Sequence, residues 1–213
     1  SGGQSQRVAL ARALAPGSSL VLLDEPFCSL DVEVRSRLRS ELSSVLKSCS
    51  ASAILVTHDP HEALAICDRV AVLRSGEIQQ YSTPFEIVSN PSNDFVGQFV
   101  LQQNVLPIQY IDDCYSTCIG KLNVPNDISI SSKSVCMFDT NSILIHPCSN
   151  SLFTVISKEY RINHYIYTVI NDNIKLRSVM SLDANLSIGD KCKVETIHEK
   201  NFLVLPENIK SKF

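Results

Sequence analysis

The sequence of 213 residues lacks any hydrophobic run long enough to cross a membrane. Its longest apolar segments are short pieces such as residues 20–23 and 53–56, far below the roughly 18 residues that a membrane helix requires. The first seven residues, Ser-Gly-Gly-Gln-Ser-Gln-Arg, do not have the pattern of a secretory signal peptide. We therefore expect a soluble globular protein.

A strong charge and a disulfide or metal framework are also missing. The 19 basic residues are balanced by 22 acidic ones, which disfavours a dedicated nucleic-acid binder. The eight cysteines include no Cys-x-x-Cys pair, a usage that fits a reducing cytoplasm. The nearest spacing to a metal site is Cys114-x-x-x-Cys118, without a second cysteine or histidine pair. We interpret these thiols as buried or idle rather than as metal ligands.

Composition changes near residue 100. Residues 1–100 hold nine of the ten alanines and seven of the nine arginines, whereas residues 101–213 hold eleven of the thirteen asparagines. Such a shift is typical of two differently built segments in one chain. We predict one domain over residues 1–100 and a second over residues 101–213.

The first segment alternates helical and strand patterns. Helices are predicted over residues 4–15, 32–47 and 61–67, and strands over residues 20–24, 53–57, 70–73 and 77–80. Thr83-Pro84-Phe85-Glu86 is a helix start with a capping box. Alternation of this kind predicts an α/β domain with a parallel sheet.

The second segment has little helical periodicity. Its short β-branched or aromatic runs are separated by Asn-Asp, Asp-Asn and Gly-Asp turns. Strands are predicted over residues 152–159, 165–170, 174–180, 191–197 and 202–205. They indicate a small all-β domain, barrel-like or OB-like.

Three patterns in the first segment carry possible chemistry. Ser1-Gly2-Gly3-Gln4 opens a helix, whose free N–H groups and dipole suit a phosphate, although a plain helix cap explains it equally well. Asp24 and Glu25 end an apolar strand; Asp24 can hold Mg²⁺ through water and Glu25 can act as a general base, or both can be structural. A second apolar strand ends at His58, which can donate to a phosphate at the same sheet edge.

These motifs, in this order, resemble the ATP-binding subunits of ABC transporters. Residues 1–14 are similar to the signature motif and its helix, and residues 20–24 to the Walker B strand, with Glu25 as the catalytic glutamate. Residues 28–31 resemble the D-loop, with Cys28 where serine is usual and Asp31 at its end. His58 matches the switch histidine, and residues 59–100 resemble the importer branch.

The resemblance implies the C-terminal part of a P-loop NTPase domain of ABC type. It implies ATP and Mg²⁺ as cofactors and a homodimer that sandwiches two ATP molecules. Ser1, Gly2, Gly3 and Gln4 of one copy would face the ATP held by the other, while Asp24, Glu25 and His58 would complete their own centre. Further implied partners are a membrane permease and, indirectly, a solute-binding protein, with the subunit at the cytoplasmic face of the inner membrane.

The second segment resembles the β-rich TOBE domain of importer ATPases. The apolar strand at residues 143–147 is similar to that domain's strand before Arg-Pro-Glu, with His146 and Cys148 in place of the arginine and glutamate. Residues 95–106 are similar to the junction in ferric iron importers, which favours iron as the solute. Polyamine, sulfate and sugar importers share the architecture.

The sequence contains no Gly-x-x-x-x-Gly-Lys-Ser/Thr motif, and its one Gly-Lys pair, Gly120-Lys121, is followed by Leu122. We expect that loop to lie upstream of Ser1, so that the chain is a fragment that does not hydrolyse ATP alone. A non-hydrolysing remnant or regulatory protein is the alternative hypothesis. A soluble ABC ATPase of DNA repair or translation is disfavoured by the importer-like β segment.

Overall fold

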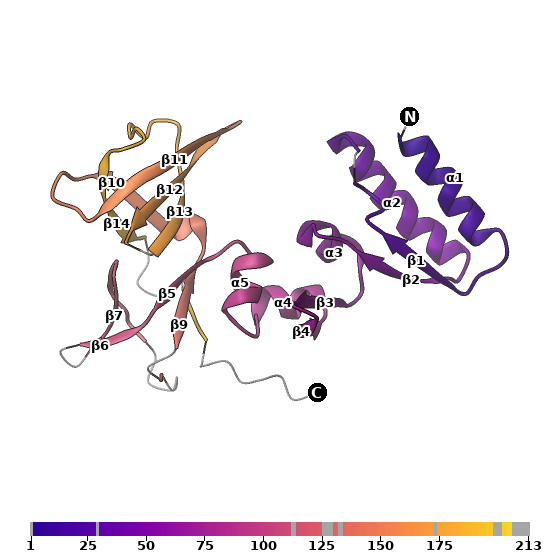
Figure 1. Ribbon diagram of the computed structural model, residues 1–213, viewed down its shortest axis with the longest axis horizontal. Coiled ribbons are helices and arrows are strands. Elements are labelled where there is room, and N and C mark those ends of the chain that lie inside the picture. The colour runs from indigo at the N-terminus through magenta and orange to yellow at the C-terminus, as the bar shows by residue number, and fades with distance from the viewer. Residues whose placement is uncertain are drawn as a thin grey trace. The chain divides into compact units, whose positions relative to one another are not determined.

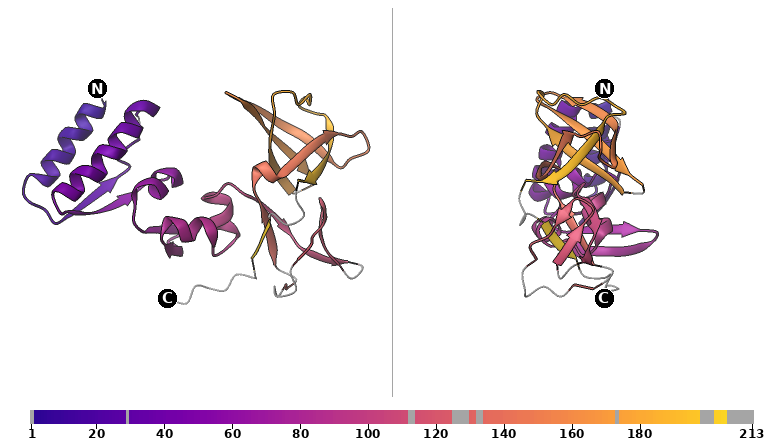
Figure 2. Two further views of the ribbon diagram at one scale, coloured as in Figure 1. Left: turned by 180° about the vertical axis from the view of Figure 1, so that it is seen from behind. Right: turned by 90° about the vertical axis from the view of Figure 1, so that its left-hand side faces the viewer.

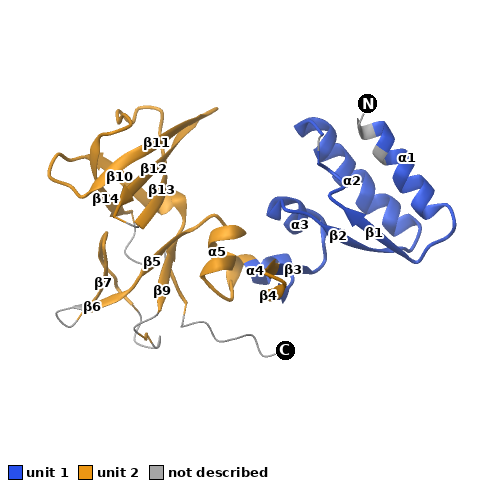
Figure 3. Cartoon of the chain, in the orientation of Figure 1, with its two compact units in different colours: residues 1–72, 81–87 blue, residues 73–80, 88–213 orange. Residues whose placement is uncertain are grey.

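The computed structural model describes residues 2–28, 30–111, 114–124, 130–131, 134–172, 174–197 and 202–205 (Figure 1). The chain forms two compact units (Figure 3): unit 1 comprises residues 1–72 and 81–87, and unit 2 comprises residues 73–80 and 88–213. The predicted domain boundary at residue 100 stays a prediction. In the part of the chain that is described, no helix has the length and apolar character needed to cross a membrane.

Unit 1 is built around a pair of parallel strands. Its elements in chain order are α1 (Gly2–Leu14), β1 (Leu20–Asp24), α2 (Val32–Ser48), β2 (Ser52–Val56) and α3 (Pro60–Ile66). Strands β1 and β2 pair in parallel, from Leu20 opposite Ser52 to Asp24 opposite Val56. The predicted alternation of helices and strands is thereby confirmed, with bounds that differ from the prediction by one or two residues.

One face of this strand pair is covered by helices. Helices α1 and α2 lie side by side in Figures 1 and 2, and the buried side chains of unit 1 gather where α2 meets the strands. Core residues Phe27, Leu30, Leu38 and Leu42 pack with partly buried Leu10, Leu23, Val34, Leu46, Leu55 and Ile66. On the opposite face of the strands, Leu20, Leu22, Ile54 and Val56 are exposed. Because successive side chains of a strand point to opposite faces, one face of the strand pair is packed against the core and the other is exposed.

The segment after α3 contributes residues to both units. It comprises β3 (Val70–Arg74), β4 (Glu77–Ser82) and α4 (Pro84–Ser89). The predicted capping box at α4 is confirmed: the Thr83 amide donates to Glu86 Oε2 at 3.0 Å, and the Glu86 amide donates to Thr83 Oγ1 at 3.3 Å. The amide and the hydroxyl of Thr83 both donate to Glu86 Oε2, and these two hydrogen bonds lower the pKa of the Glu86 carboxyl.

Unit 2 is rich in strands, as the sequence predicts, and also contains helix α5 (Asp94–Phe99). Its strands are β5 (Asn104–Pro107), β6 (Gln109–Ile111), β7 (Cys114–Thr117), β8 (Gly120–Lys121), β9 (Val135–Phe138), β10 (Ile143–Pro147), β11 (Phe153–Arg161), β12 (His164–Asn171), β13 (Ile174–Met180), β14 (Lys191–Thr196) and β15 (Phe202–Leu205). They form sheets in the orders β10-β14-β11-β12-β13, β15-β9-β5 and β6-β7-β8. Sequence reasoning missed α5 and the strands β5 to β9.

The five-stranded sheet curls until its two outer strands meet. Buried Ser178 on β13 donates through Oγ to the carbonyl of Ile143 on β10 at 2.5 Å. This side-chain bond joins the two outer strands, and the barrel-like or OB-like architecture of the segment stays a prediction. The narrower assignment to a TOBE domain stays a prediction.

A single buried amide joins the second sheet to the first. Asn104 on β5 donates from Nδ2 to the carbonyl of Arg177 at 2.8 Å and accepts from the Arg177 amide through Oδ1 at 2.7 Å. The side chain thereby substitutes for a strand partner at the edge of β13. Since amide donors and acceptors must be satisfied when buried, this contact holds the two sheets in register.

Two cysteines belong to the core of unit 2. None of the eight cysteines, which all lie in the described part of the chain, is in a disulfide bond, and Cys136 and Cys192 are buried. Burial raises the pKa of Cys136 to about 12 and that of Cys192 to about 11. Since the thiolate is the reactive species, these two side chains act as small hydrophobic residues in the core of unit 2.

We expect Asn104→Ala to destabilise the protein by about 2 kcal/mol, because it removes two hydrogen bonds and leaves partly buried backbone groups of Arg177 without these partners. Asn104→Asp should also destabilise, since a carboxylate cannot donate to the Arg177 carbonyl. Urea unfolding measures both values, and exposed Asn150→Ala is the matched control. An Asn104→Ala variant as stable as the control would contradict this role.

Candidate functional site

Parallel pairing places the predicted catalytic residues at one edge of unit 1. Strand β1 ends at Asp24 and β2 ends at Val56, directly opposite. The amide of Glu25 donates to the carbonyl of Val56 at 2.9 Å and so extends the pairing one residue beyond β1. Glu25 and His58 therefore leave the two strands side by side.

Glu25 and His58 are in direct contact. Glu25 Oε1 lies 2.7 Å from His58 Nδ1 and also accepts the backbone amide of His58 at 3.0 Å. Because an ionised carboxylate can only accept, Nδ1 carries the proton in this contact. The hydrogen bond and the charge of Glu25 both raise the pKa of His58.

The histidine is held at one nitrogen and open at the other. The His58 side chain is 80% exposed, whereas that of Glu25 is 33% exposed. With Nδ1 directed to Glu25, Nε2 remains the ring atom that can meet a ligand. The arrangement can therefore hold an imidazole in a fixed orientation beside a carboxylate and present its far nitrogen to an anionic group.

Glu25 occupies an unusual backbone conformation for its residue type. Its φ is +45°, in the left-handed region that costs a residue with a side chain free energy. The bonds from Glu25 N to Val56 and from His58 to Oε1 hold this geometry. The sequence gives no sign of this strain, since glutamate has no preference for the left-handed region.

A second polar cluster supports the segment around His58. Thr57 Oγ1 donates to Glu62 Oε2 at 2.7 Å and accepts the Asp59 amide at 3.1 Å. Asp59 caps α3 by accepting the amide of His61 through Oδ1. Arg35 on α2 approaches both Asp59 and Glu62. Sequence reasoning missed this cluster, because neither the burial of Glu62 nor its approach by Arg35 leaves a pattern in the sequence.

The other predicted site residues lie elsewhere in unit 1. Asp24 is an exposed carboxylate at the end of β1, and Asp31 caps α2 by accepting the amide of Val34 at 2.9 Å. Gly2, Gly3 and Gln4 form the first turn of α1, and Ser1 lies outside the described residues. Among the described residues there is no cluster of three or more potential metal ligands. Asp24 can supply one oxygen ligand, the number that Mg²⁺ typically takes when phosphates and water complete its shell.

Helix α1 is fastened to α2 by a charged clamp. Arg7 donates to both oxygens of Glu41, at 2.9 and 2.8 Å, and Arg37 donates to the same carboxylate at 2.9 Å. A bidentate arginine fixes orientation as well as distance. These ion pairs thereby join α1 to α2, the helix whose N-cap is Asp31.

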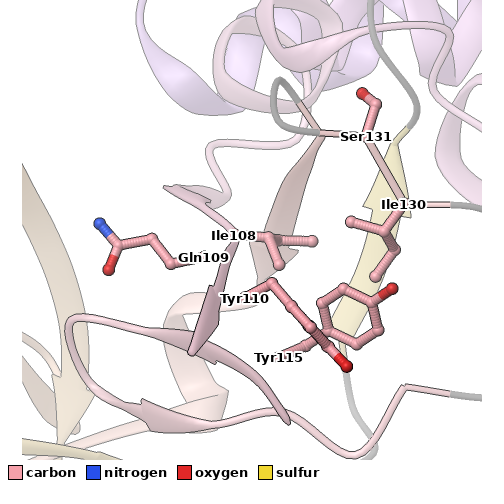
Figure 4. Close-up of a pocket in the computed structure, with 6 residues that line it drawn as sticks. All are labelled: Ile108, Gln109, Tyr110, Tyr115, Ile130 and Ser131. Carbon is pink, nitrogen blue, oxygen red and sulfur yellow. The ribbon is translucent and has the colours of Figure 1, made fainter. Parts of the chain in front are cut away.

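A separate pocket of about 570 Å³ lies in unit 2 (Figure 4). Tyr110 and Tyr115, whose ring centroids lie 5.0 Å apart, line the pocket together with Ile108 and Ile130. The Gln109 side chain points away from these rings in Figure 4. The described residues of its lining include no carboxylate or imidazole, whereas the strand ends of unit 1 carry both.

We expect the free energy of unfolding to depend on pH through the contact between Glu25 and His58. Because folding raises the pKa of His58, the contact stabilises fully below the unfolded pKa, about 6.5 for histidine. That stabilisation is lost as the pH rises through the raised folded value.

Glu25→Gln should therefore destabilise the protein more at about pH 6 than at about pH 8.5. Urea unfolding at both values measures this difference, with exposed Glu77→Gln as the control. NMR titration of the His58 ring should show a lower pKa in Glu25→Gln. An equal loss of stability at both pH values would count against the contact.

Known proteins share this sequence and its motifs. A family model described as ABC transporter matches residues 1–28. The chain is 42% identical over 154 residues to the Fe(3+) ions import ATP-binding protein FbpC of Haemophilus influenzae (strain 86-028NP), covering 72% of this chain and 42% of that protein. It is 37% identical over 197 residues to FbpC of Streptomyces coelicolor, covering 92% of this chain and 56% of that protein.

Importers named for other solutes are similar too. The sulfate/thiosulfate import ATP-binding protein CysA 2 of Chromobacterium violaceum is 50% identical over 109 residues, covering 51% of this chain and 30% of that protein. The chain thus spans 30 to 56% of the length of these three relatives. Their matches, together with the ordered motifs at the strand ends, show that the chain belongs to the ATP-binding subunits of ABC importers.

Proposed function

We propose that this protein is the ATP-hydrolysing subunit of an ABC importer and that Glu25 and His58 are its catalytic residues. The observation that carries the proposal is the 2.7 Å contact between Glu25 Oε1 and His58 Nδ1 at adjacent strand ends. Glu25 would accept the proton of an attacking water. His58, in its doubly protonated form with Nδ1–H donated to Glu25, would donate from Nε2 to the terminal phosphate.

ATP would supply the phosphoanhydride bond that is cleaved. Asp24, exposed at the end of β1, would hold Mg²⁺ through water and is well placed because it is the neighbour of Glu25. The residues that cradle the phosphates of the same ATP do not occur in the 213 residues as a Gly-rich Lys-Ser/Thr motif. They would come from elsewhere in the complete subunit.

A second copy would complete each site. The first turn of α1, with Ser1, Gly2, Gly3 and Gln4, would face the ATP bound by the partner copy, where its free N–H groups and positive dipole favour phosphate. Asp31 would contribute by fixing the start of α2, which in turn clamps α1 through Glu41. Closure of the dimer would drive a permease at the cytoplasmic face of the membrane, supplied with solute by a solute-binding protein. Unit 2 would serve as a TOBE-like regulatory domain.

Replacement of Glu25 tests the catalytic assignment. In the importer purified with its permease, Glu25→Gln should lower kcat for ATP hydrolysis by about 100-fold or more, since a general base contributes at least that factor. KM for ATP should change little, because the amide keeps the size of the carboxylate. Steady-state phosphate release measures both constants.

Exposed Glu77→Gln is the matched control and should keep the native rate. Loss of hydrolysis in Glu25→Gln alone supports the proposal. A native complex that binds its permease but hydrolyses no ATP would instead favour the non-hydrolysing, regulatory alternative.

Ferric iron is the solute that we propose. The two iron-import relatives align over 154 and 197 residues, whereas the sulfate-import relative aligns over 109. Each of these alignments is longer than unit 1 and so extends into unit 2, and those to the iron importers extend further than that to the sulfate importer. Polyamine importers are the next candidates, since one from Mycoplasma genitalium aligns over 198 residues but at the lower identity of 33%.

Uptake by cells separates these solutes. Cells whose only copy carries Glu25→Gln should lose most of their uptake of ferric iron, because hydrolysis energises import. Uptake of spermidine and of sulfate should match that of cells with the native protein. A loss confined to spermidine or sulfate would overturn the assignment to iron and leave the hydrolytic assignment intact.

A further inference from the structure

Arg35 connects the segment before α2 with the segment that carries His58. It lies in the first turn of α2, and its side chain is 30% exposed. Its Nη2 donates to the carbonyl of Leu30 at 3.2 Å. Its Nη1 lies 3.9 Å from Asp59 Oδ2, and its Nε lies 3.9 Å from Glu62 Oε1. The guanidinium of Arg35 thus approaches the carbonyl before α2 and two carboxylates in the segment that follows β2.

The contact between Arg35 and Glu62 matters because Glu62 is a buried carboxylate. The residue is 3% exposed, and a carboxylate withdrawn from water to this degree requires a partner charge or hydrogen bonds. Arg35 provides the charge at Oε1, and Thr57 provides a hydrogen bond of 2.7 Å at Oε2. The distance of 3.9 Å from Arg35 makes the first contact an ion pair rather than a hydrogen bond.

The cluster holds the chain on both sides of His58. Thr57 precedes the histidine and Asp59 follows it, and the two are joined by the bond from the Asp59 amide to Thr57 Oγ1 at 3.1 Å. His58 itself is exposed and has little packing around its ring. Its position at Glu25 therefore depends on the backbone between Thr57 and Asp59.

We propose that Arg35 is a positioning residue for His58: by pairing with buried Glu62 and with Asp59, it holds the turn from Thr57 to Asp59 where the imidazole meets Glu25. The consequence for catalysis rests on the proposed function above. The positional role does not, because the contact between His58 and Glu25 exists without ATP.

The test is an NMR titration of the His58 ring in the 213-residue chain. The charges of Glu25, Glu62 and Asp59 raise its pKa, and the charge of a nearby cation such as Arg35 acts in the opposite direction. Loss of the Arg35 charge alone would raise the pKa further. Loss of positioning would separate His58 from Glu25 and lower it. The two effects of Arg35→Ala have opposite signs.

We expect Arg35→Ala to lower the pKa of His58 most of the way to its value in Glu25→Gln. Arg35→Lys keeps the charge and should restore most of the native value. Arg37→Ala removes an arginine from the same helix, with a side chain 73% exposed and paired with Glu41, and should leave the titration unchanged. An unchanged or raised pKa in folded Arg35→Ala would overturn the proposal.

Arg35→Met provides a second route if Arg35→Ala does not fold. It keeps most of the aliphatic length of the side chain but removes the cation that pairs with Glu62 and Asp59. The pKa of His58 should again fall, and an unchanged or raised pKa would overturn the proposal. Because no ATP hydrolysis is measured, failure of the proposed function and failure of this inference give different results.

Discussion

The parallel pairing of β1 with β2 determines where the candidate catalytic side chains lie. Both strands run to the same edge, so the residues that follow them, Glu25 and His58, meet although 33 positions separate them. The hydrogen bond from the Glu25 amide to Val56 extends the pairing to the residue that we propose as the general base. Within unit 1, α2 packs its buried face against this strand pair, and the bond from Thr57 to Glu62 holds the segment that follows β2.

Helix α2 makes two connections to the rest of unit 1, one to the segment after β2 and one to α1. At its start, Asp31 caps the helix and Arg35 reaches toward Asp59 and Glu62. In its middle, Glu41 accepts from Arg7 and thereby fixes α1. Helix α2 thus relates the loop before it, the turn that carries His58 and the helix that opens the sequence. A single amphipathic helix serves as the common reference for all three because its buried Leu38 and Leu42 anchor it in the core.

The sequence predicted the elements of unit 1 because each has a local signal. Apolar periods, the Thr83–Glu86 capping box and the apolar runs at β1 and β2 agree with the structure, and the adjacency of Asp24, Glu25 and His58 follows from parallel pairing. The strands β5 to β9 were missed because they are two to four residues long, too short for a clear alternation of apolar and polar residues. In addition, β5 pairs with β9, which lies far from it in the sequence. The roles of Arg35 and Glu62 could not be predicted, since burial of a charge is decided by tertiary packing rather than by any period in the sequence.

The conformation of Glu25 is itself an argument for function. Positive φ angles also occur at Ser50, Ser75, Gln102 and Asp172, of which Ser75 and Asp172 lie in short connections between successive strands. Glu25 instead follows a strand within a motif, where glycine or asparagine would adopt the same angle at lower cost. The strain, of order 1 kcal/mol, is offset by the hydrogen bonds that the Glu25 carboxylate accepts from His58. Glycine and asparagine have no charged side chain that could accept these bonds. A strained residue retained for its side chain is what a general base held in place by its neighbours requires.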